Sequence, residues 1–297
     1  MKVSVLTISY NIEKFIAEAI NSALMQELSS DYEIVIGEDC SADKTREIVI
    51  DYQRKYTDKI RLFLNEKNMG MARNFANTFD RCKGEYIALL DGDDYWISPY
   101  KLQKQTNFLD NHPECAICFH DVRIFYEDSD EKPHTMNPPI QRPFLTMEDL
   151  LSRGCFIYSC SAMIRRDMFN GFPEWYFANG GKCDGDWAFY ILVSQHGKIG
   201  YIDEVMSAYR VHKGGVWSGL NEIEQIEGVI DFYKAMNANL NFKYNKIINT
   251  MISKYYYELA FAQKKNGNIA KAMKYLFKCF ITDPFNKLIP FQNLTKF

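Results

Sequence analysis

The stretch that most constrains the fold runs from Tyr86 to Trp96 and reads YIALLDGDDYW. Residues 86–90 form an unbroken apolar run, which is typical of a strand buried on both faces of a parallel sheet. Three carboxylates follow without a spacer, at Asp91, Asp93 and Asp94. Open α/β sheets bind ligands at the carboxyl ends of their strands. The stretch therefore predicts a buried parallel strand that ends in an acidic ligand site.

These three carboxylates lie too close together in the chain to ionise at low cost unless a cation sits among them. Their hard oxygen donors suit Mg²⁺ or Mn²⁺, and such ions also bind phosphate oxygens. An acidic surface turn is the alternative interpretation, because Asp and Gly are common in turns.

Strand-like and helical segments alternate around this stretch. Strands are predicted at residues 2–8, 32–37, 60–64 and 86–90, and apolar stripes with helical spacing at 15–24, 48–56 and 71–79. This alternation predicts βαβ units with right-handed crossovers, and hence an α/β fold with a mostly parallel central sheet flanked by helices. The first 110 residues are therefore expected to form a nucleotide-binding half-domain.

The second half of the chain has a mixed pattern. We expect a strand pair at 115–126, a loop at 127–143, a helix at 146–153, a strand at 157–164, a helix at 184–196, strands at 199–202 and 205–211, and long helices after 219. Residues 256–284 look like one tetratricopeptide-type helix pair, and a single copy cannot form a solenoid. The predicted domains are 1–219, with halves 1–110 and 111–219, and a helical C-terminal extension at 220–297.

Charge and composition narrow the class of protein. The formal net charge of −3 argues against a general nucleic-acid binder, but residues 264–297 carry seven Lys against one acidic residue. This basic, Phe-containing tail could meet an anionic membrane surface, or its lysines could form a solvated face on packed helices. No stretch approaches about 18 consecutive apolar residues, no signal peptide is recognised, and the eight Cys show no disulfide framework. We therefore expect a cytoplasmic protein.

Six motifs occur in a characteristic order: VSVLTISYN, IVIGEDCSADKT, NMGMARN, YIALLDGDDYW, GDW and YRVH. Together they resemble the family 2 glycosyltransferases of the GT-A fold, over roughly residues 1–215. The resemblance implies transfer of a sugar from a nucleoside diphosphate to a hydroxyl acceptor. Bacterial relatives of this kind build surface polysaccharides and glycolipids on lipid carriers at the inner face of the membrane.

The resemblance also assigns nucleotide-binding residues, which are Ile8, Ser9, Tyr10, Asn11, Asp39, Arg73, Asp91 and Gly92. Tyr10 offers a flat face for stacking on uracil, with ordinary packing as the alternative. Asp39 matches the acid that accepts a hydrogen bond from the ring N–H of the base, which favours UDP. Relatives usually show Asp-Asp-Gly-Ser where this chain has Glu38-Asp39-Cys40-Ser41, which puts a contact from Glu38 in doubt. Arg73 suits diphosphate or base-edge contact, with a surface salt bridge as the alternative.

The acidic stretch matches the family's metal site, so the resemblance implies Mn²⁺ or Mg²⁺ held by Asp93, Asp94 and His212. A divalent ion there would stabilise the charge that develops on the departing diphosphate. His212 completes the metal shell or closes over the diphosphate in several relatives, and a solvated loop His is the alternative. Arg210 and Lys213 beside it could neutralise phosphate.

Catalysis further requires a base that takes the proton of the acceptor hydroxyl. The candidates are Asp184 and Asp186 in CDGDWAFYI, and Asp186 is preferred because Trp187 and an apolar helix follow it in the family's spacing. One carboxylate acting as base, without a second one as nucleophile, implies inversion at the anomeric carbon.

The sequence therefore predicts an inverting, metal-dependent hexosyltransferase that uses a UDP-sugar and a saccharide or lipid-linked saccharide acceptor, with peripheral membrane contact through the tail. Two alternatives from other classes stay open. A nucleotidyltransferase would share the sheet and the metal site, but such enzymes usually carry a glycine-rich basic signature near the first strand, which TISYN lacks. A non-catalytic sugar-nucleotide-binding or adaptor protein is the second.

Overall fold

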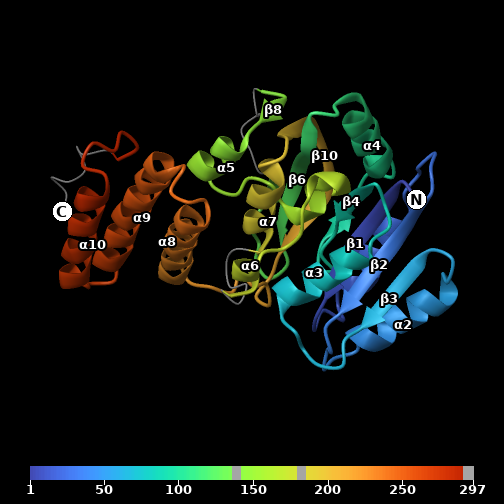
Figure 1. Ribbon diagram of the computed structural model, residues 1–297. Coiled ribbons are helices and arrows are strands. Elements are labelled where there is room, and N and C mark those ends of the chain that lie inside the picture. The colour runs from blue at the N-terminus through green and yellow to red at the C-terminus, as the bar shows by residue number, and fades with distance from the viewer. Residues whose placement is uncertain (136–141, 179–184, 290–297) are drawn as a thin grey trace. The chain divides into compact units, whose positions relative to one another are not determined.

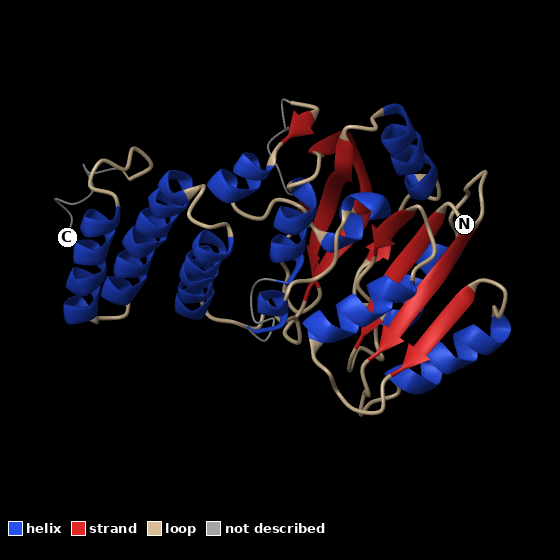
Figure 2. Cartoon of the chain, viewed as in Figure 1, coloured by secondary structure: helices blue, strands red, loops and turns tan. Residues whose placement is uncertain are grey.

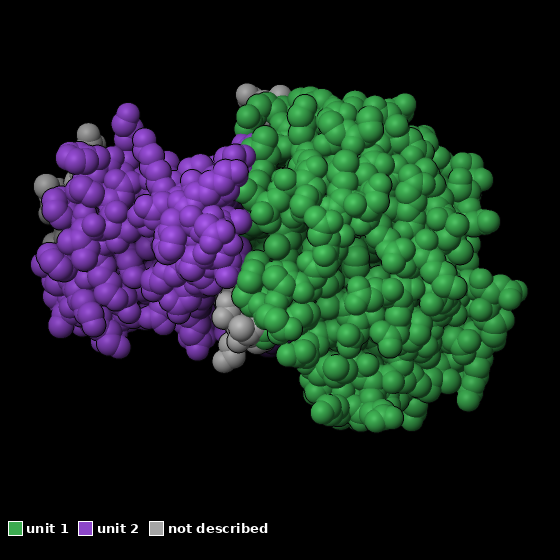
Figure 3. All heavy atoms as spheres, in the orientation of Figure 1, with its two compact units in different colours: residues 1–147, 155–181, 185–212 green, residues 148–154, 182–184, 213–297 purple. Residues whose placement is uncertain are grey.

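The computed structural model describes residues 1–135, 142–178 and 185–289. Strands and helices alternate through the first half of the chain, and helices alone follow β10 (Figures 1 and 2). The chain divides into two compact units, residues 1–147, 155–181 and 185–212, and residues 148–154, 182–184 and 213–297 (Figure 3). None of the described helices combines the length and the apolar character that crossing a membrane requires.

Four parallel strands form the first half of the sheet in the spatial order β3-β2-β1-β4. Their bounds are β1 (Val3–Ser9), β2 (Tyr32–Glu38), β3 (Ile60–Leu64) and β4 (Tyr86–Leu89), with α1 (Ile16–Leu24), α2 (Thr45–Lys55) and α3 (Met71–Arg81) as crossovers. β1, β2 and β4 are almost entirely buried, as expected for strands covered on both faces. The predicted α/β class and its mostly parallel sheet are confirmed.

The second half of the sheet departs from the predicted pattern. Two long strands run parallel to each other, β6 (Cys115–Tyr126) and β10 (Lys198–Val211). The strand pair predicted at 115–126 is therefore wrong, because β6 is one continuous strand. The two strands predicted at 199–202 and 205–211 are also one strand, since β-bulges carry the pairing through the polar Asp203-Glu204 step that suggested a turn.

Short elements complete this half. β9 (Met163–Arg165) lies antiparallel between β4 and β6, β5 (Tyr95–Trp96) pairs with the edge of β10, and β7 (His134–Thr135) and β8 (Phe144–Leu145) are two-residue strands. Most of the strand predicted at 157–164 is instead a loop with a 3₁₀ turn at Ser159–Ser161, which is followed by β9. A second 3₁₀ turn, Arg166–Met168, and α6 (Glu174–Ala178) precede α7 (Gly185–Ser194).

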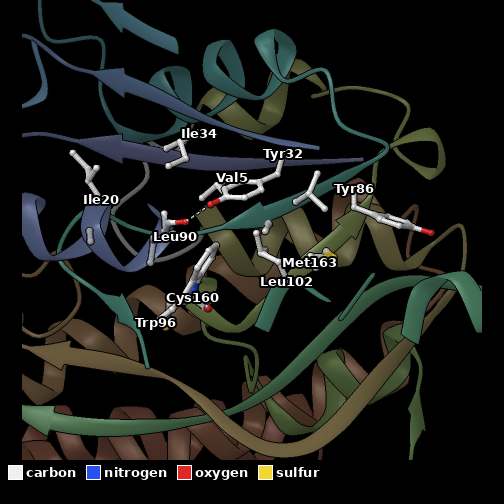
Figure 4. Packing of buried hydrophobic residues seen from close by; sticks show 14 of the residues in the cluster. Val5, Ile20, Tyr32, Ile34, Tyr86, Leu90, Trp96, Leu102, Cys160 and Met163 are labelled. Atoms are coloured by element: carbon white, nitrogen blue, oxygen red, sulfur yellow. Dashed lines mark hydrogen bonds between the residues drawn. The ribbon is translucent and has the colours of Figure 1, made fainter. Parts of the chain in front are cut away.

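Helices cover both faces of the sheet. On one face, apolar residues of α1, α2 and α4 (Lys101–Asn111) pack against Val5, Ile34 and their neighbours. Figure 4 shows this core, in which the Trp96 indole N–H donates to the Cys160 carbonyl at 2.8 Å. On the other face, α3 and α7 meet through edge-on aromatic rings, with the Phe75 and Phe189 centroids 5.1 Å apart.

The second unit is helical and contains most of α5 (Met147–Arg153) together with α8 (Glu222–Asn239), α9 (Asn245–Lys265) and α10 (Ile269–Thr282). Asn221 begins α8 with a capping box, and the Tyr233 hydroxyl donates to the Leu151 carbonyl of α5 at 2.9 Å. α9 packs against both α8 and α10. The C-terminal helices are thus present, whereas the domain boundaries at 110 and 219 and the tetratricopeptide-like pair stay predictions.

A buried lysine begins α4 in the core of the first unit. Lys101 is 0% exposed, and its Nζ lies 4.0 Å from the Trp96 ring centroid. Among the described residues this nitrogen has no hydrogen-bond partner. Burial lowers the pKa of Lys101 to about 7. The charged form of this side chain therefore destabilises the folded protein.

We expect Lys101→Met to raise the free energy of unfolding at pH 7 by roughly 1–4 kcal/mol, because it removes a buried, unpaired charge. Since the lysine pKa is lower in the folded than in the unfolded state, the unfolded chain binds the extra proton above pH 7, and the wild type gains stability as pH rises. The advantage of Met should then shrink by about 2 kcal/mol between pH 7 and pH 9. Urea unfolding at both pH values measures this difference, and a less stable variant at pH 7 would contradict it.

Candidate active site

Two loops at the carboxyl ends of β1 and β2 are held together by reciprocal hydrogen bonds. The Asn11 backbone N–H donates to the Ser41 hydroxyl at 3.0 Å, and the Ala42 N–H donates back to the Asn11 side chain at 2.8 Å. The Lys44 N–H donates to the Glu13 carboxylate at 2.8 Å. Asn11 adopts a φ of 52°, in the left-handed region that Asn tolerates better than most residues. The two loops therefore form one rigid rim at this edge of the sheet.

The predicted base-binding residues lie along this rim. Ile8 and Ser9 are still in β1, where they pair with Gly37 and Glu38 of β2. Tyr10 and Asn11 reach solvent, and 46% of the surface of Tyr10 is exposed. An exposed aromatic ring on a rigid rim is free to stack on a planar ligand.

Asp39 is buried beneath the rim, and its carboxylate accepts three hydrogen bonds. The donors are the Asn65 side-chain amide at 2.8 Å and the Met69 and Gly70 backbone N–H groups, both at 2.9 Å. Asp39 thereby fixes the loop that leads into α3. A nucleobase N–H would have to share this carboxylate with the three donors already present. The contact between Asp39 and a base stays a prediction.

Glu38 has a structural role in this region. Its side chain is fully buried, pairs with Arg46 at 2.5 Å and accepts the Ser41 N–H at 2.6 Å. Burial of a carboxylate is tolerated when it is paired and hydrogen-bonded in this way. This arrangement supports the doubt, raised by the departure from the family motif, that Glu38 contacts the nucleotide.

The three carboxylates after β4 lie in different environments. Asp91 accepts a hydrogen bond from the Ser159 hydroxyl, and Asp93 Oδ2 lies 3.1 Å from His212 Nε2. Asp94 Oδ1 accepts the Arg210 backbone N–H at 2.8 Å, and the Cys160 thiol lies within hydrogen-bonding reach of the Asp94 carboxylate. Burial, followed by the charges of neighbouring carboxylates, raises the pKa values of Asp91 and Asp94 well above the usual range. A cation at this position would relieve that repulsion.

Gly92 separates the first two of these carboxylates and is closely packed. A Cβ placed on Gly92 would lie 2.4 Å from Ile12 Cδ1, 2.9 Å from Ile16 Cδ1 and 3.1 Å from the Ile8 carbonyl oxygen. The backbone between Asp91 and Asp93 therefore lies directly against the start of α1 and the rim.

Arg210 is engaged within the protein, so the expectation that it could neutralise phosphate is wrong. Its buried side chain pairs with Glu18 at 2.5 Å and with Glu127, and its Nε donates to the Asp93 carbonyl at 2.8 Å. The guanidinium also lies over the Phe15 ring, 4.5 Å from its centroid. Together with its backbone contact to Asp94, this makes Arg210 a residue that positions the acidic stretch.

Asp186 lies in the first turn of α7, close to the carboxylates that follow β4. The Ser159 hydroxyl, which donates to Asp91, is also within hydrogen-bonding reach of Asp186. Burial raises the pKa of Asp186 to about 6, and the charge of Asp93 acts in the same direction. The structure thus brings Asp91, Asp93 and Asp186 together, whereas Asp184 lies outside the described residues.

Ser159 was not identified from the sequence as a site residue. It lies on the 3₁₀ turn that replaces a predicted strand, and the motif order gives no signal for it.

Arg73 and His212 were identified from the sequence, and each lies against an aromatic ring. The exposed Arg73 guanidinium is 4.9 Å from the Phe177 ring centroid, and the His212 ring is 4.8 Å from that of Phe15.

Within residues 1–135, 142–178 and 185–289, no three His, Cys, Asp or Glu side chains are grouped so that they alone could hold a metal ion. Mg²⁺ sites commonly use one or two carboxylates and complete their shell with substrate phosphate oxygens and water. The partly exposed Asp93 carboxylate, with His212 beside it, fits such a shared site. Asp94 fits it less well, because it is buried and already accepts the Arg210 N–H.

The parallel strands and the acidic turn after β4 lie in the part of the chain that matches a known family. The family model of glycosyl transferase family 2 covers residues 4–172, which is more than half of the chain. The chain belongs to glycosyl transferase family 2. The resemblance carried by the motifs is therefore confirmed.

Relatives of the chain include an uncharacterized protein of Mycobacterium tuberculosis, 36% identical over 214 residues. That match spans 72% of this chain and 60% of the relative's length. Poly(ribitol-phosphate) beta-N-acetylglucosaminyltransferase TarS of Staphylococcus aureus is 37% identical over 114 residues, 38% of this chain and 19% of TarS.

Two solved structures share the fold of this family 2 chain. TarS 1-349 in complex with UDP-GlcNAc matches with a TM-score of 0.60 and 21% identity, over 99% of this chain and 78% of that one. The mannosyltransferase PcManGT of Pyrobaculum calidifontis, in complex with GDP-Man and Mn²⁺, matches with a TM-score of 0.62 and 16% identity, over 93% and 74%. At these identities the likeness shows the GT-A fold.

Proposed function

We propose that this family 2 chain is a divalent-metal-dependent, inverting glycosyltransferase that moves a sugar from UDP to a hydroxyl group. One observation carries the proposal, namely that Asp186 lies beside Asp91 and Asp93 at the carboxyl end of β4, near the Ser159 hydroxyl that donates to Asp91. A candidate base thus lies beside a candidate diphosphate site. A nucleotidyltransferase has no need of this base, because its attacking phosphate oxygen is already ionised.

The rim formed by the β1 and β2 loops is the proposed nucleotide site. Tyr10 offers its exposed ring to the base, and Asn11 fixes the backbone next to it. The UDP-GlcNAc bound by TarS supports UDP as the nucleotide. Asp39 supports the same choice if one of its lone pairs accepts the ring N–H of uracil.

Asp93 is the proposed direct metal ligand, with His212 as its neighbour and Asp94 as a support held by Arg210. A divalent ion bound there stabilises the negative charge on the departing diphosphate. The Mn²⁺ in the PcManGT complex supports a metal for this fold. Arg210, through the Asp93 carbonyl, keeps this stretch of backbone in place.

Asp186 is the proposed base. Its carboxylate takes the proton of the acceptor hydroxyl while that oxygen bonds to the anomeric carbon and the bond to the diphosphate breaks. A single displacement of this kind inverts the anomeric configuration. The acceptor is a saccharide or lipid-linked saccharide in bacterial surface-glycan synthesis at the cytoplasmic side of the membrane, supported by the poly(ribitol-phosphate) named for TarS.

Incubation with UDP-, GDP-, CMP- and dTDP-sugars, in Mn²⁺ or in EDTA, tests this function by mass spectrometry. We expect metal-dependent release of UDP from one or two UDP-sugars. Release of UDP in EDTA would contradict the dependence on a metal ion. Release of GDP alone would contradict UDP as the donor nucleotide. No release, together with no UDP-induced rise in melting temperature, would favour the non-catalytic adaptor alternative. Synthesis of a UDP-sugar from UTP and a sugar 1-phosphate would identify a nucleotidyltransferase.

A further inference from the structure

The outward face of α10 carries large apolar side chains that no other described part of the chain covers. The members of this apolar stripe are more than half exposed, and they are Ile269, Met273, Phe277, Phe280, Ile281, Phe285 and Leu288. The opposite face of α10 packs on α9, where the Ser253 hydroxyl donates to the Cys279 carbonyl at 3.0 Å. A contiguous apolar surface of this kind marks an interaction site.

Lysines lie on one flank of the apolar stripe. At about 100° per residue, Lys271, Lys274 and Lys278 fall on the helical strip next to the apolar one. Lys271 and Lys274 are exposed, as is Lys287 in the segment that follows α10. At the helix end, Asp283 accepts the Thr250 hydroxyl of α9 at 2.8 Å. The exposed Glu227 of α8 accepts the Tyr275 hydroxyl of α10 at 3.0 Å, on the side of the lysines that faces away from the stripe. The exposed charge directly beside the stripe is therefore positive.

We propose that α10 and residues 285–288 form a docking surface for an anionic lipid bilayer. Helices that lie in the membrane interface combine an apolar strip with Lys side chains at its edge, which reach the lipid headgroups while the apolar strip enters the acyl region. Phe285, with 87% of its surface exposed, extends this strip beyond the helix end.

Charge favours a bilayer over a second copy of the chain. Two copies that met through this face would bring two lysine strips into one interface without an acidic side chain in the strip to pair with them. An anionic bilayer supplies the missing negative charge and attracts each nearby Lys. The inference does not depend on the donor, the metal or the base of the proposed reaction.

Flotation of the full chain with vesicles of phosphatidylcholine, with and without phosphatidylglycerol, tests the proposal. We expect binding only to the anionic vesicles, with a dissociation constant that rises with salt. Lys271→Glu, Lys274→Glu and Lys287→Glu together should weaken binding roughly a hundredfold or more. Phe277→Ser with Phe280→Ser should abolish it. The charge-matched control is Lys55→Glu, Lys83→Glu and Lys132→Glu together, and Phe242→Ser is the control for loss of an exposed Phe. These changes alter exposed residues elsewhere, and the variants should bind as the wild type does.

Circular dichroism melts of each variant verify that loss of binding is not loss of folding. UDP-sugar hydrolysis in solution should be unchanged in every variant, which separates this proposal from the catalytic one. Equal binding to both vesicle types, or wild-type binding by the Phe277→Ser, Phe280→Ser variant, would overturn it. A concentration-dependent dimer in light scattering that the same variant dissolves would instead assign the surface to a second copy.

Discussion

Asp186→Asn is expected to lower the rate of sugar transfer by roughly 10²–10⁴-fold, because an amide cannot take the proton of the acceptor hydroxyl. The variant keeps the size and shape of the side chain, so Ser159 retains an oxygen acceptor at this position. Binding of UDP in Mn²⁺, measured by calorimetry, should change little, since Asp186 does not lie on the rim. The loss should therefore appear in kcat far more than in the nucleotide affinity.

Asp80→Asn is the matched control, because Asp80 is an exposed aspartate at the far end of α3. It should retain the wild-type rate. NMR of the product should show an anomeric configuration opposite to that of the donor. A product with retained configuration would rule out the single displacement. A kcat for Asp186→Asn within tenfold of the wild type would remove Asp186 from the role of base and leave Asp184 as the other candidate.

Asp93→Asn is expected to lower metal-dependent transfer by roughly 10³-fold, because the charge that holds the cation is lost. The amide oxygen can still accept a hydrogen bond from His212, so the local fold should persist. In Asp93→Asn, Mn²⁺ should no longer strengthen the binding of UDP. Differential scanning fluorimetry with UDP, in Mn²⁺ and in EDTA, measures this directly, and the wild type alone should show the extra stabilisation.

Asp58→Asn provides the control for the removal of one negative charge, since Asp58 is exposed and distant in the chain from the acidic stretch. It should behave as the wild type in both assays. Full Mn²⁺-dependent stabilisation by UDP in Asp93→Asn would show that Asp93 does not hold the metal. Asp94→Asn would then be the next variant, although Arg210 already occupies one oxygen of that carboxylate.

The first half of the fold could be predicted from the sequence because its signals are local. The apolar run at 86–90 ends where the carboxylates begin, and parallel strands bring such ends to one edge of the sheet. Tyr10 and Asn11, which follow β1, were assigned through the resemblance to family 2 glycosyltransferases. Asp186 was preferred because Trp187 and an apolar helix follow it in the spacing of that family.

The remaining features depend on contacts that no local pattern encodes. Arg210 pairs with Glu18, 192 positions earlier in the chain, and with Glu127, 83 positions earlier. Ser159 reaches Asp91 across 68 positions from a turn that was predicted to be a strand. Whether Arg210 meets phosphate or carboxylates, and whether β10 breaks at its polar step, is decided by neighbours that only the folded chain supplies.

The close packing of Gly92 makes the middle of the acidic motif mutationally intolerant, even though its backbone conformation is open to any amino acid. A new side chain at this position must displace the tips of Ile12, in the loop before α1, and of Ile16, which begins α1, and press on the Ile8 carbonyl. That displacement would reach the rim residues before it altered any carboxylate. In a saturation library, position 92 should therefore resemble a core position, and substitutions there should damage nucleotide and metal binding in the same clones.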